Sequence, residues 1–374
     1  MLLFLSGLES AWGEIPSLKM TRIIYTYTQL EIVSLCCVLF FMIMLSVCGN
    51  ILLIWIICTN SKMRTTQNIF VASLACTDAG LGIICMPLTL VATAYDGWIL
   101  PDAMGKLHGF CIGLLFMTTL WTITAMTIDK YFTIVYPLNR TITVSRTKYI
   151  IAGIWIMTSI WSAMPLLGWQ RYTFNSSTHS YGLAIPKNIA EKMFLHMTMI
   201  LGFAVPLGVM AYAYTRIYRA VQQHSKRISG FSRGKSAAEE VIKTQQHLIK
   251  TLIIVLTLFI VCWTPFCIFI VLGSFSEGDH IKWVGTLAYW FGFSASCWNP
   301  IVYVSRSNRY KEAAIAIWVS LKRTVCFWTR DDDEDDIPEP VMKPTNDIPM
   351  GFKKRSGQEK FKGLVFENKY GSVP

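Results

Sequence analysis

The stretch IVSLCCVLFFMIMLSVCGNILLIWIICT occupies residues 32–59 and contains no Asp, Glu, Lys or Arg. A helix needs about 20 apolar residues to cross the hydrocarbon core of a bilayer, so this stretch is long enough to span a membrane. Six further apolar blocks follow, at residues 68–95, 105–133, 148–168, 192–220, 247–275 and 281–304. The sequence therefore predicts an all-α fold, a bundle of seven transmembrane helices over residues 32–305.

Composition supports this interpretation. Apolar residues make up 53% of the chain and charged residues 15%, whereas an average soluble domain is about 25% charged. The net charge of +11 would suit either nucleic acid or a membrane surface. Where the basic residues lie in the sequence can distinguish a nucleic-acid partner from a membrane surface.

The basic residues are distributed unevenly between the loops. The loops after the second, fourth and sixth blocks contain only Arg171 and Lys187. Because cytoplasmic loops are enriched in Lys and Arg, the chain is predicted to be a multi-pass protein of the cell membrane with an extracellular N-terminus and a cytoplasmic C-terminus. No nucleic-acid partner is needed to explain the charge. The loops after the first, third and fifth blocks contain Lys62, Arg64, Arg140, Arg146, Lys148, Lys226, Arg227, Arg233, Lys235 and Lys243.

The flanking segments are expected to have different roles. Residues 1–31 are predicted to be an extracellular N-terminus, and residues 306–322 an amphipathic helix on the inner membrane surface, since basic and apolar residues alternate there. Residues 323–374 are predicted to be a disordered cytoplasmic tail. Cys326 is a candidate for S-acylation, with a free thiol as the alternative. Asn175-Ser176-Ser177 is a glycosylation sequon in an outer loop, used or unused.

Polar residues inside the blocks are candidates for function, because an ionisable group is costly in a membrane span. Asp78 lies near the middle of the second block, and Asp129 lies at the cytosolic end of the third. Pro206, Pro265 and Pro300 interrupt the last three blocks. Since proline removes a helical hydrogen bond, these helices are predicted to bend.

Taken together, the motifs resemble those of the rhodopsin-like (class A) G-protein-coupled receptors. Any one of them is weak, but they occur in order and each lies on the matching span. The resemblance covers about residues 30–325. The residues that carry it are Asn50, Asp78, Asp129, Lys130, Tyr131, Pro206, Tyr214, Phe259, Trp263, Pro265, Asn299, Pro300 and Tyr303.

The resemblance implies a receptor that passes a stimulus to heterotrimeric G proteins by rearranging its helices, with arrestin, kinases and membrane lipids as further partners. Trp263 would be the toggle below the ligand, and Tyr214 and Tyr303 would meet through water in the active state. Pro206, Phe259 and Leu120 would relay the movement. The family's sodium ion would be held by Asp78, Thr119, Ser296 and Asn299. The alternative is a protonated Asp78 in a hydrogen-bond network, because a buried carboxylate must be paired, coordinated or protonated.

The chain also departs from the family pattern. Lys130 replaces the usual Arg, and Gln245 stands where an acidic partner is often found, so we expect a weakened resting-state lock and raised basal signalling. Alternatively, Asp129 and Lys130 pair within one turn. Gly105 replaces the usual first cysteine of the outer disulfide, and residues 169–190 contain no Cys. No outer disulfide is therefore expected.

The ligand site that the resemblance implies is apolar and aromatic. Such a lining suits a small hydrophobic ligand, although a self-packed pocket without ligand is the alternative. Ile112 replaces the Asp of amine receptors. Residues 165–172 resemble an opsin, but Phe293 replaces the retinal-binding Lys, so no covalent retinal is expected. The residues predicted to line the pocket are His108, Ile112, Phe116, Thr198, Gly202, Phe266, Ile270, Tyr289 and Phe293.

Other functional classes have little support. The sequence has no zinc-protease motif, no phosphate-binding loop and no His/Cys cluster with metal-ligand spacing, so we expect no enzyme activity. Transporters usually contain repeats and paired broken helices, which are not apparent. Two alternatives stay open beside a ligand-responsive or basally active receptor. They are an opsin-related non-covalent photoreceptor and a receptor-like protein without G-protein coupling.

Overall fold

A computed structural model describes residues 27–136, 142–229, 235–275 and 282–329. Within these ranges, the side chains of residues 62, 224–229, 235–248, 270–275, 282 and 320–329 are not described. Most of the predicted N-terminal segment and the tail beyond residue 329 lie outside the described residues. So do the side chains of Gln245, Ile270 and Cys326.

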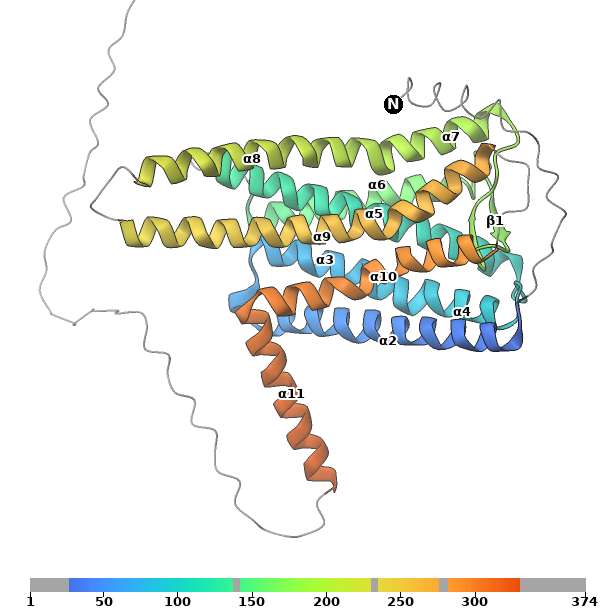
Figure 1. The fold of residues 1–374 in the computed structure, drawn as a ribbon, viewed down its shortest axis with the longest axis horizontal. Coiled ribbons are helices and arrows are strands. Elements are labelled where there is room, and N and C mark those ends of the chain that lie inside the picture. The colour runs from blue at the N-terminus through green and yellow to red at the C-terminus, as the bar shows by residue number, and fades with distance from the viewer. Residues whose placement is uncertain (1–26, 137–141, 230–234, 276–281, 330–374) are drawn as a thin grey trace, which may run out of the picture. The chain divides into compact units, whose positions relative to one another are not determined.

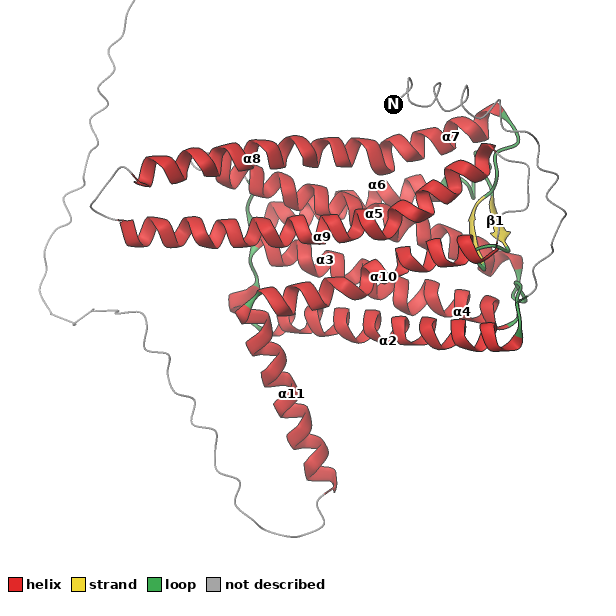
Figure 2. Cartoon of the chain, in the orientation of Figure 1, coloured by secondary structure: helices red, strands yellow, loops and turns green. Residues whose placement is uncertain are grey.

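The described chain is almost entirely helical (Figures 1 and 2). The first three spans are α2 (Gln29–Thr59), α3–α4 (Thr66–Gly80 and Met86–Ala94, joined by the π turn Leu81–Cys85) and α5 (Asp102–Val135). A short 3-10 turn, Ser61–Met63, follows α2. The later elements are α6 (Val144–Ala163), β1 (Tyr172–Asn175), β2 (Ser180–Leu183), α7 (Ile189–Met199), α8 (Val205–Ser229), α9 (Lys235–Phe275), α10 (Lys282–Arg306) and α11 (Asn308–Thr329), with a π turn, Ile200–Ala204, between α7 and α8.

The predicted bundle is present. Within the described residues, α2, α3–α4, α5, α6, α7–α8, α9 and α10 form seven adjoining rods (Figure 1). α5 packs against α3, α6 and α8 and against both strands, so it is the central helix. Five of the rods are long and apolar enough to cross a membrane: α2, α3–α4, α5, α7 through residue 223, and α9 over residues 249–269.

Some predicted boundaries need correction. The fourth block was predicted to reach residue 168, but α6 ends at Ala163. Pro165 has no backbone N–H for helix continuation, and Gly168 adopts φ +97°, a value that favours glycine. The chain therefore turns out of the helix and directs residues 169–171 towards the strands.

The prolines in the spans differ in their effect on the helices. The π turn Ile200–Ala204 directly precedes Pro206, and the π turn Leu81–Cys85 directly precedes Met86-Pro87. Wider turns of this kind accommodate a missing helical hydrogen bond. Pro265 and Pro300 lie inside continuous helices, α9 and α10. A widened turn therefore accompanies Pro206 in span five, one of the three prolines expected to bend a helix. The widened turn in span two lies beside Pro87, for which no bend was predicted.

A β-hairpin after α6 was not predicted. Its antiparallel register pairs Tyr172 with Leu183 and Phe174 with Tyr181. Both strands pack against α5, at the end of the bundle that carries β1 in Figure 1. The hairpin therefore covers one end of the bundle, the end that the sequence predicts to be extracellular.

Glycines on α5 make room for the hairpin. A Cβ on Gly105 would overlap the ring of Tyr181, and a Cβ on Gly109 would lie 2.6 Å from the ring of Tyr172. Gly113 continues the row at the same four-residue spacing, 3.4 Å from the hydroxyl of Tyr172. Residues four apart lie on one face of a helix. This face of α5 is thus flat where the two tyrosines rest.

Hydrogen bonds also hold the hairpin against α5 and α6. The Tyr181 hydroxyl donates to Asp102 Oδ1 at 2.9 Å, and the Tyr172 hydroxyl donates to the Ser162 carbonyl at 2.9 Å. Burial, together with the Asp102 carboxylate, raises the pKa of Tyr181 to about 12, so this phenol stays a donor at every physiological pH. All described cysteines are free thiols. The hairpin is therefore held to α5 by packing and hydrogen bonds.

The loop between the strands connects to other elements at the same end of the bundle. His179 Nε2 lies 2.8 Å from Asp96 Oδ1, before α5. The Thr286 hydroxyl of α10 donates to the Ser177 carbonyl at 2.9 Å and lies 3.0 Å from the Tyr27 hydroxyl. The hairpin is thus tied to the start of α2, to the segment before α5 and to α10.

The start of α11 packs on the bundle. The ring of Tyr310 is buried 6.0 Å from that of Tyr303. Arg309 and Lys311 are exposed, as are Ile315 and Trp318. The observed helix, Asn308–Thr329, is longer than the predicted 306–322. The position of this helix on the inner membrane surface stays a prediction.

Candidate functional site

A cavity of about 160 Å³ lies beneath the hairpin. Tyr172 and Tyr181 form part of its outer wall, and Phe116 and Trp263 form part of its inner wall. The walls are almost wholly apolar, and no Asp, Glu, Lys, Arg or His is among the described residues that line it. The remaining lining residues from the helices are Gly109, Ile112, Gly113, Met117, Trp161, Ser162, Phe194, Leu195, Thr198, Met199, Phe203, Phe266, Cys267 and Tyr289.

The cavity contains most, but not all, of the predicted ligand residues. Ile112, Phe116, Thr198, Phe266 and Tyr289 line it. The Thr198 hydroxyl accepts a hydrogen bond from Trp161 Nε1 at 3.1 Å, which joins α6 to α7. The side chain of Ile270 is outside the described residues.

Three predicted pocket residues lie elsewhere. His108 is buried against the second span, with Nε2 3.2 Å from the Thr89 hydroxyl and 3.1 Å from the Cys85 carbonyl. Phe293 is buried in the cluster around α2 and α10, with its ring 4.6 Å from Tyr289. Gly202 faces Met117. Counting along helices placed all three near the cavity, but His108 is bonded to the second span and Phe293 is buried among residues of α2 and α10, whereas Gly202 faces Met117, which itself lines the cavity.

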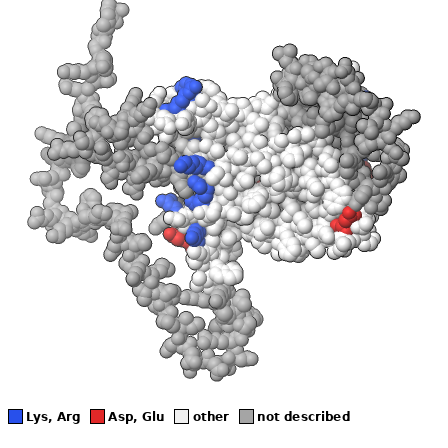
Figure 3. Space-filling view, in the orientation of Figure 1, with Lys and Arg blue, Asp and Glu red and all other residues white. Residues whose placement is uncertain are grey.

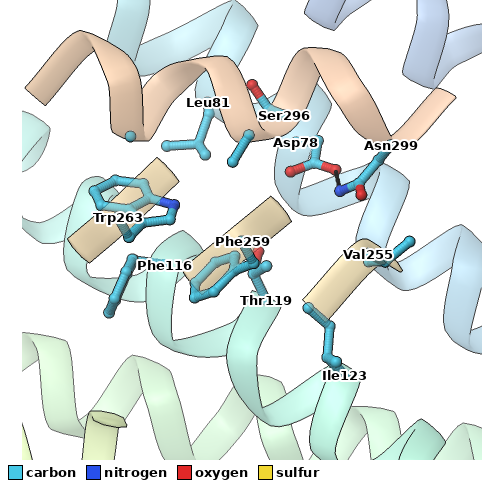
Figure 4. A pocket seen from close by; sticks show the side chains of 12 residues that line it. Asp78, Leu81, Phe116, Thr119, Ile123, Val255, Phe259, Trp263, Ser296 and Asn299 are labelled. Carbon is cyan, nitrogen blue, oxygen red and sulfur yellow. Dashed lines mark hydrogen bonds between the residues drawn. The ribbon is translucent and has the colours of Figure 1, made fainter. Parts of the chain in front are cut away.

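A smaller cavity, about 10 Å³, lies deeper in the bundle (Figure 4). This is room for about one water molecule or ion. Asp78, Thr119, Ser296 and Asn299, the predicted sodium ligands, all line it. Asn299 Nδ2 donates to Asp78 Oδ2 at 2.6 Å. The four side chains thus meet at one point, although α3, α5 and α10 are far apart in the sequence.

The donor set fits a small hard cation. The Thr119 hydroxyl donates to the Thr77 hydroxyl at 2.8 Å, and the Ser296 hydroxyl donates to the Phe293 carbonyl at 2.8 Å. Each hydroxyl oxygen therefore uses its proton elsewhere and keeps its lone pairs for a ligand. Carboxylate, amide and hydroxyl oxygens are the ligands that hard cations prefer.

Asn50 supports this site from α2. Its Nδ2 donates to the carbonyls of Ser46 and Ser296, at 2.8 and 3.0 Å. The Ser46 hydroxyl donates to the Asp78 carbonyl at 2.9 Å. Asn50, one of the residues that carry the family resemblance, therefore bonds to the backbones of α2 and α10 beside Asp78.

An aromatic group separates the two cavities. Phe116 and Trp263 line both of them, and their ring centroids are 4.7 Å apart. Phe259 lies below, 5.5 Å from Phe116. Gly292 of α10 lies against the indole, where a Cβ would be 2.9 Å from Trp263. A change of the Trp263 rotamer would therefore alter both cavities.

At the other end of the bundle, the predicted Asp129–Lys130 pair is present. Lys130 Nζ lies 3.9 Å from Asp129 Oδ2, and both side chains are buried. The Thr127 hydroxyl donates to the Tyr214 hydroxyl at 3.1 Å, which joins α5 to α8. Tyr131 packs against Tyr212 of α8, with ring centroids 6.2 Å apart.

A contact between α9 and α10 at this end was not anticipated. Arg306 Nε donates to the Thr251 hydroxyl at 3.0 Å. No family motif includes these residues, and only their positions at the cytosolic ends of two predicted spans could have drawn attention to them. The hairpin residues Tyr172 and Tyr181 were also missed. Their signal was a pair of aromatic-containing segments separated by Ser, Thr and His.

Comparison with known proteins agrees with this geometry. A family model described as "7 transmembrane receptor (rhodopsin family)" matches residues 49–303. The chain belongs to the rhodopsin family of seven-transmembrane receptors. Members of this family are class A G-protein-coupled receptors, so the predicted fold class and family are confirmed. The family is a receptor class rather than an enzyme family.

This rhodopsin-family receptor is similar to several differently named proteins. It is 27% identical over 309 residues to the substance-K receptor of Canis lupus familiaris, covering 79% of this chain and 77% of that receptor. It is 27% identical over 279 residues to a melanopsin of Branchiostoma belcheri, covering 71% of this chain and 39% of the melanopsin. Squid rhodopsin shares the fold, with a TM-score of 0.74 at 20% identity over 85% of this chain and 95% of that chain.

The receptor's residues do not fit covalently bound retinal. Phe293 stands at the position of the opsin lysine, and its ring is packed against Tyr289. No Lys is among the described residues that line the outer cavity. A Schiff base therefore has no amine in the described part of this site.

Proposed function

We propose that this receptor converts an extracellular or membrane-borne stimulus into activation of heterotrimeric G proteins. The observation that carries the proposal is the shared wall of the two cavities, Phe116 and Trp263. A ligand in the outer cavity contacts the same indole that closes the inner cavity. Ligand binding and the state of Asp78 are then linked, because a ligand shifts an equilibrium by its different affinity for two states.

The inner cavity is proposed to hold a sodium ion in the resting state. Asp78 would supply the negative charge. The neutral oxygen ligands would come from Thr119, Ser296 and Asn299. The Asn299–Asp78 bond of 2.6 Å also supports the alternative, a protonated Asp78 in a hydrogen-bond network. Either way, movement of Trp263 on α9 changes the surroundings of the carboxyl group.

The basic end of the bundle is proposed to face the cytosol and the G protein. Figure 3 shows Lys and Arg gathered at one end of the visible surface. Cytoplasmic segments are enriched in these residues. Anionic lipids would also be attracted there, and arrestin and receptor kinases are proposed to use the same end. Among the described residues, the exposed basic ones at this end are Arg64, Arg146, Lys148, Arg219, Lys250, Arg309 and Lys311.

Second-messenger assays test this proposal. Cells that express the receptor are expected to raise or lower cAMP, calcium or inositol phosphate relative to untransfected cells. Trp263→Ala and Asp129→Ala are expected to change that output at equal surface expression. Tyr149→Phe, at an exposed position of α6, serves as the control. Unchanged output on every channel in well-expressed cells would favour a receptor-like protein without coupling.

A non-covalent photoreceptor is the second candidate, favoured by the likeness to melanopsin. The purified protein would then gain a visible absorption band after incubation with retinal and dialysis. A spectrum identical to that of the protein alone would remove this candidate.

A further inference from the structure

A hydrogen bond joins α9 to α10 at the basic end of the bundle. Arg306 Nε donates to the Thr251 hydroxyl at 3.0 Å. Thr251 is buried, and Arg306 is half-buried. A hydrogen bond with a charged donor is about twice as strong as one between neutral groups. The bond therefore adds to the packing that fixes this end of α9 beside α10.

The backbone around Arg306 is held firmly. Arg306 is the last residue of α10, where the partial negative charge of the helix end favours a cation. Only Ser307 separates α10 from α11, and its N–H donates to the Tyr303 carbonyl at 3.1 Å. The rings of Tyr303 and Tyr310 are both buried at this joint. Arg306 thus extends to α9 from a fixed point.

Thr251 lies on the buried side of α9 that leads to the inner cavity. Residues four apart are neighbours on one face of a helix. The buried residues at this spacing are Thr251, Val255, Phe259 and Trp263. The last three of them line the inner cavity. Since α9 is one continuous helix over this stretch, a movement of α9 at Trp263 is carried to Thr251.

Side chains fill the space between α9 and its other neighbours at the basic end. Ile134 of α5, Ile217 of α8 and Ile249 of α9 are buried together in one cluster. A segment of another protein can enter between these helices only if they separate. If α9 is the helix that moves, as its connection to Trp263 favours, Thr251 moves with it and leaves the guanidinium group of α10.

We propose that Thr251 and Arg306 are positioning residues for G-protein coupling. Their hydrogen bond holds α9 in the closed arrangement, in which the three isoleucines are packed, and it breaks when the basic end opens for a G protein. The inference rests on the proposed receptor function and adds two residues that set the balance between the closed and open arrangements. Lys130 and Gln245 stand where the family resemblance implies an Arg and an acid. The restraint on α9 is thus assigned to spans six and seven rather than to spans three and six.

Distances between two spin labels test this on purified full-length receptor in nanodiscs, without G protein. Noncanonical amino acids carry the labels at Ile253 of α9 and Ile301 of α10, both exposed, so the native cysteines stay unlabelled. Thr251→Val keeps the shape of the side chain and removes the hydroxyl. The population with the longer α9–α10 distance is expected to rise about threefold to tenfold in this variant, equivalent to the loss of one net hydrogen bond. Thr251→Ser keeps the hydroxyl and should resemble the wild type.

Further variants locate the effect. Arg306→Met removes the donor and should raise the same population, and Thr251→Val should add nothing in that background, because the two residues act through one bond. Thr215→Val on α8 is the matched control, since the hydroxyl of this exposed residue donates to the Ala211 carbonyl of its own helix at 2.8 Å. Basal second-messenger output in cells should rise severalfold with Thr251→Val and with Arg306→Met, and stay unchanged with Thr215→Val.

Three results would overturn the inference: wild-type distances in both Thr251→Val and Arg306→Met, an equal shift with Thr251→Ser, or additive effects of the two substitutions. If Thr251→Val does not fold, Arg306→Met provides the same test. Second-messenger output with unchanged distances removes only the restraint. Shifted distances without output on any channel remove the proposed coupling and leave the restraint intact.

Discussion

At the residue scale, the carboxyl group of Asp78 depends on very few partners. Its Oδ2 accepts a hydrogen bond from Asn299 Nδ2 at 2.6 Å, and Thr119 and Ser296 line the same cavity. A buried charge with so little neutralisation needs a cation or a proton. If Asp78 binds sodium, NaCl should stabilise the receptor specifically. If Asp78 is protonated, sodium should have no specific effect on stability.

If sodium binds there, the receptor should be stabilised by NaCl more than by an equal concentration of choline chloride. A ligand at ten times its Kd adds about 1.4 kcal/mol, so we expect a rise of a few degrees in Tm. Asp78→Asn should remove that sodium-specific rise, and Asp102→Asn, an exposed outer residue, should keep it. An equal sodium effect in wild type and Asp78→Asn would leave only the protonated carboxyl group.

α2 and α10 approach closely where Gly49, which has no side chain, lies against Pro300. A Cβ on Gly49 would lie 2.8 Å from Pro300 Cγ. Gly49→Ala should therefore cost about 1–3 kcal/mol from overpacking, seen as a lower Tm. Gly153→Ala on α6 is the matched control, because nothing lies within 4 Å of its Cβ. That variant should be neutral or slightly stabilised by higher helix propensity. Equal melting of both variants would contradict the close contact.

At the element scale, the hairpin packs against α5 because glycines on α5 leave room for its tyrosine rings. Gly105→Ala and Gly109→Ala would place a methyl group against the rings of Tyr181 and Tyr172. We expect faster hydrogen exchange in β1 and β2 and a loss of about 1–3 kcal/mol in stability. Gly182→Ala in β2, with open space around its Cβ, should exchange at the wild-type rate.

A compensating variant makes this prediction sharper. Tyr181→Ala removes the ring that meets residue 105, so Gly105→Ala should be milder in that background than in the wild type. The difference measures the coupling between the two residues. Additive effects of the two substitutions would show that the ring and the glycine do not depend on each other.

The elements differ in how well the sequence predicts them. The apolar blocks predict the spans, since length and apolarity alone decide whether a helix can cross a bilayer. The strands of the hairpin have only four residues each and show little alternation. Their position depends on the α5 glycines, which is a tertiary effect. The π turns are likewise set by the prolines together with packing.

For a similar reason, the sequence predicts some residues of the candidate site correctly and misplaces others. Asp78, Thr119, Ser296 and Asn299 line one cavity as the family resemblance implies, because each lies on an inward face of a long helix. His108 and Phe293 were placed in the outer cavity by counting along α5 and α10. A rotation of part of a helical turn directs a side chain to another neighbour, and counting does not determine that rotation.

At the scale of the whole molecule, the chain has Lys130 and Gln245 at the two positions where the family resemblance implies an Arg and an acid. Lys130 is instead buried beside Asp129 at 3.9 Å. The double variant Lys130→Arg with Gln245→Glu would supply a forked ion pair between spans three and six. Basal second-messenger output is expected to fall by about threefold or more. Lys130→Arg alone is the control, and unchanged output of the double variant would show that the lock does not limit basal activity.

The central proposal is that the described bundle passes a change at Trp263 to a G protein. Nucleotide exchange by purified heterotrimers, one from each G-protein class, with the receptor in nanodiscs tests it most directly. The wild type should accelerate exchange above empty nanodiscs for at least one class, and Trp263→Ala should change that rate severalfold while Trp318→Ala, on the exposed face of α11, does not. Exchange equal to that of empty nanodiscs for every class, with correctly folded receptor, would contradict the proposal.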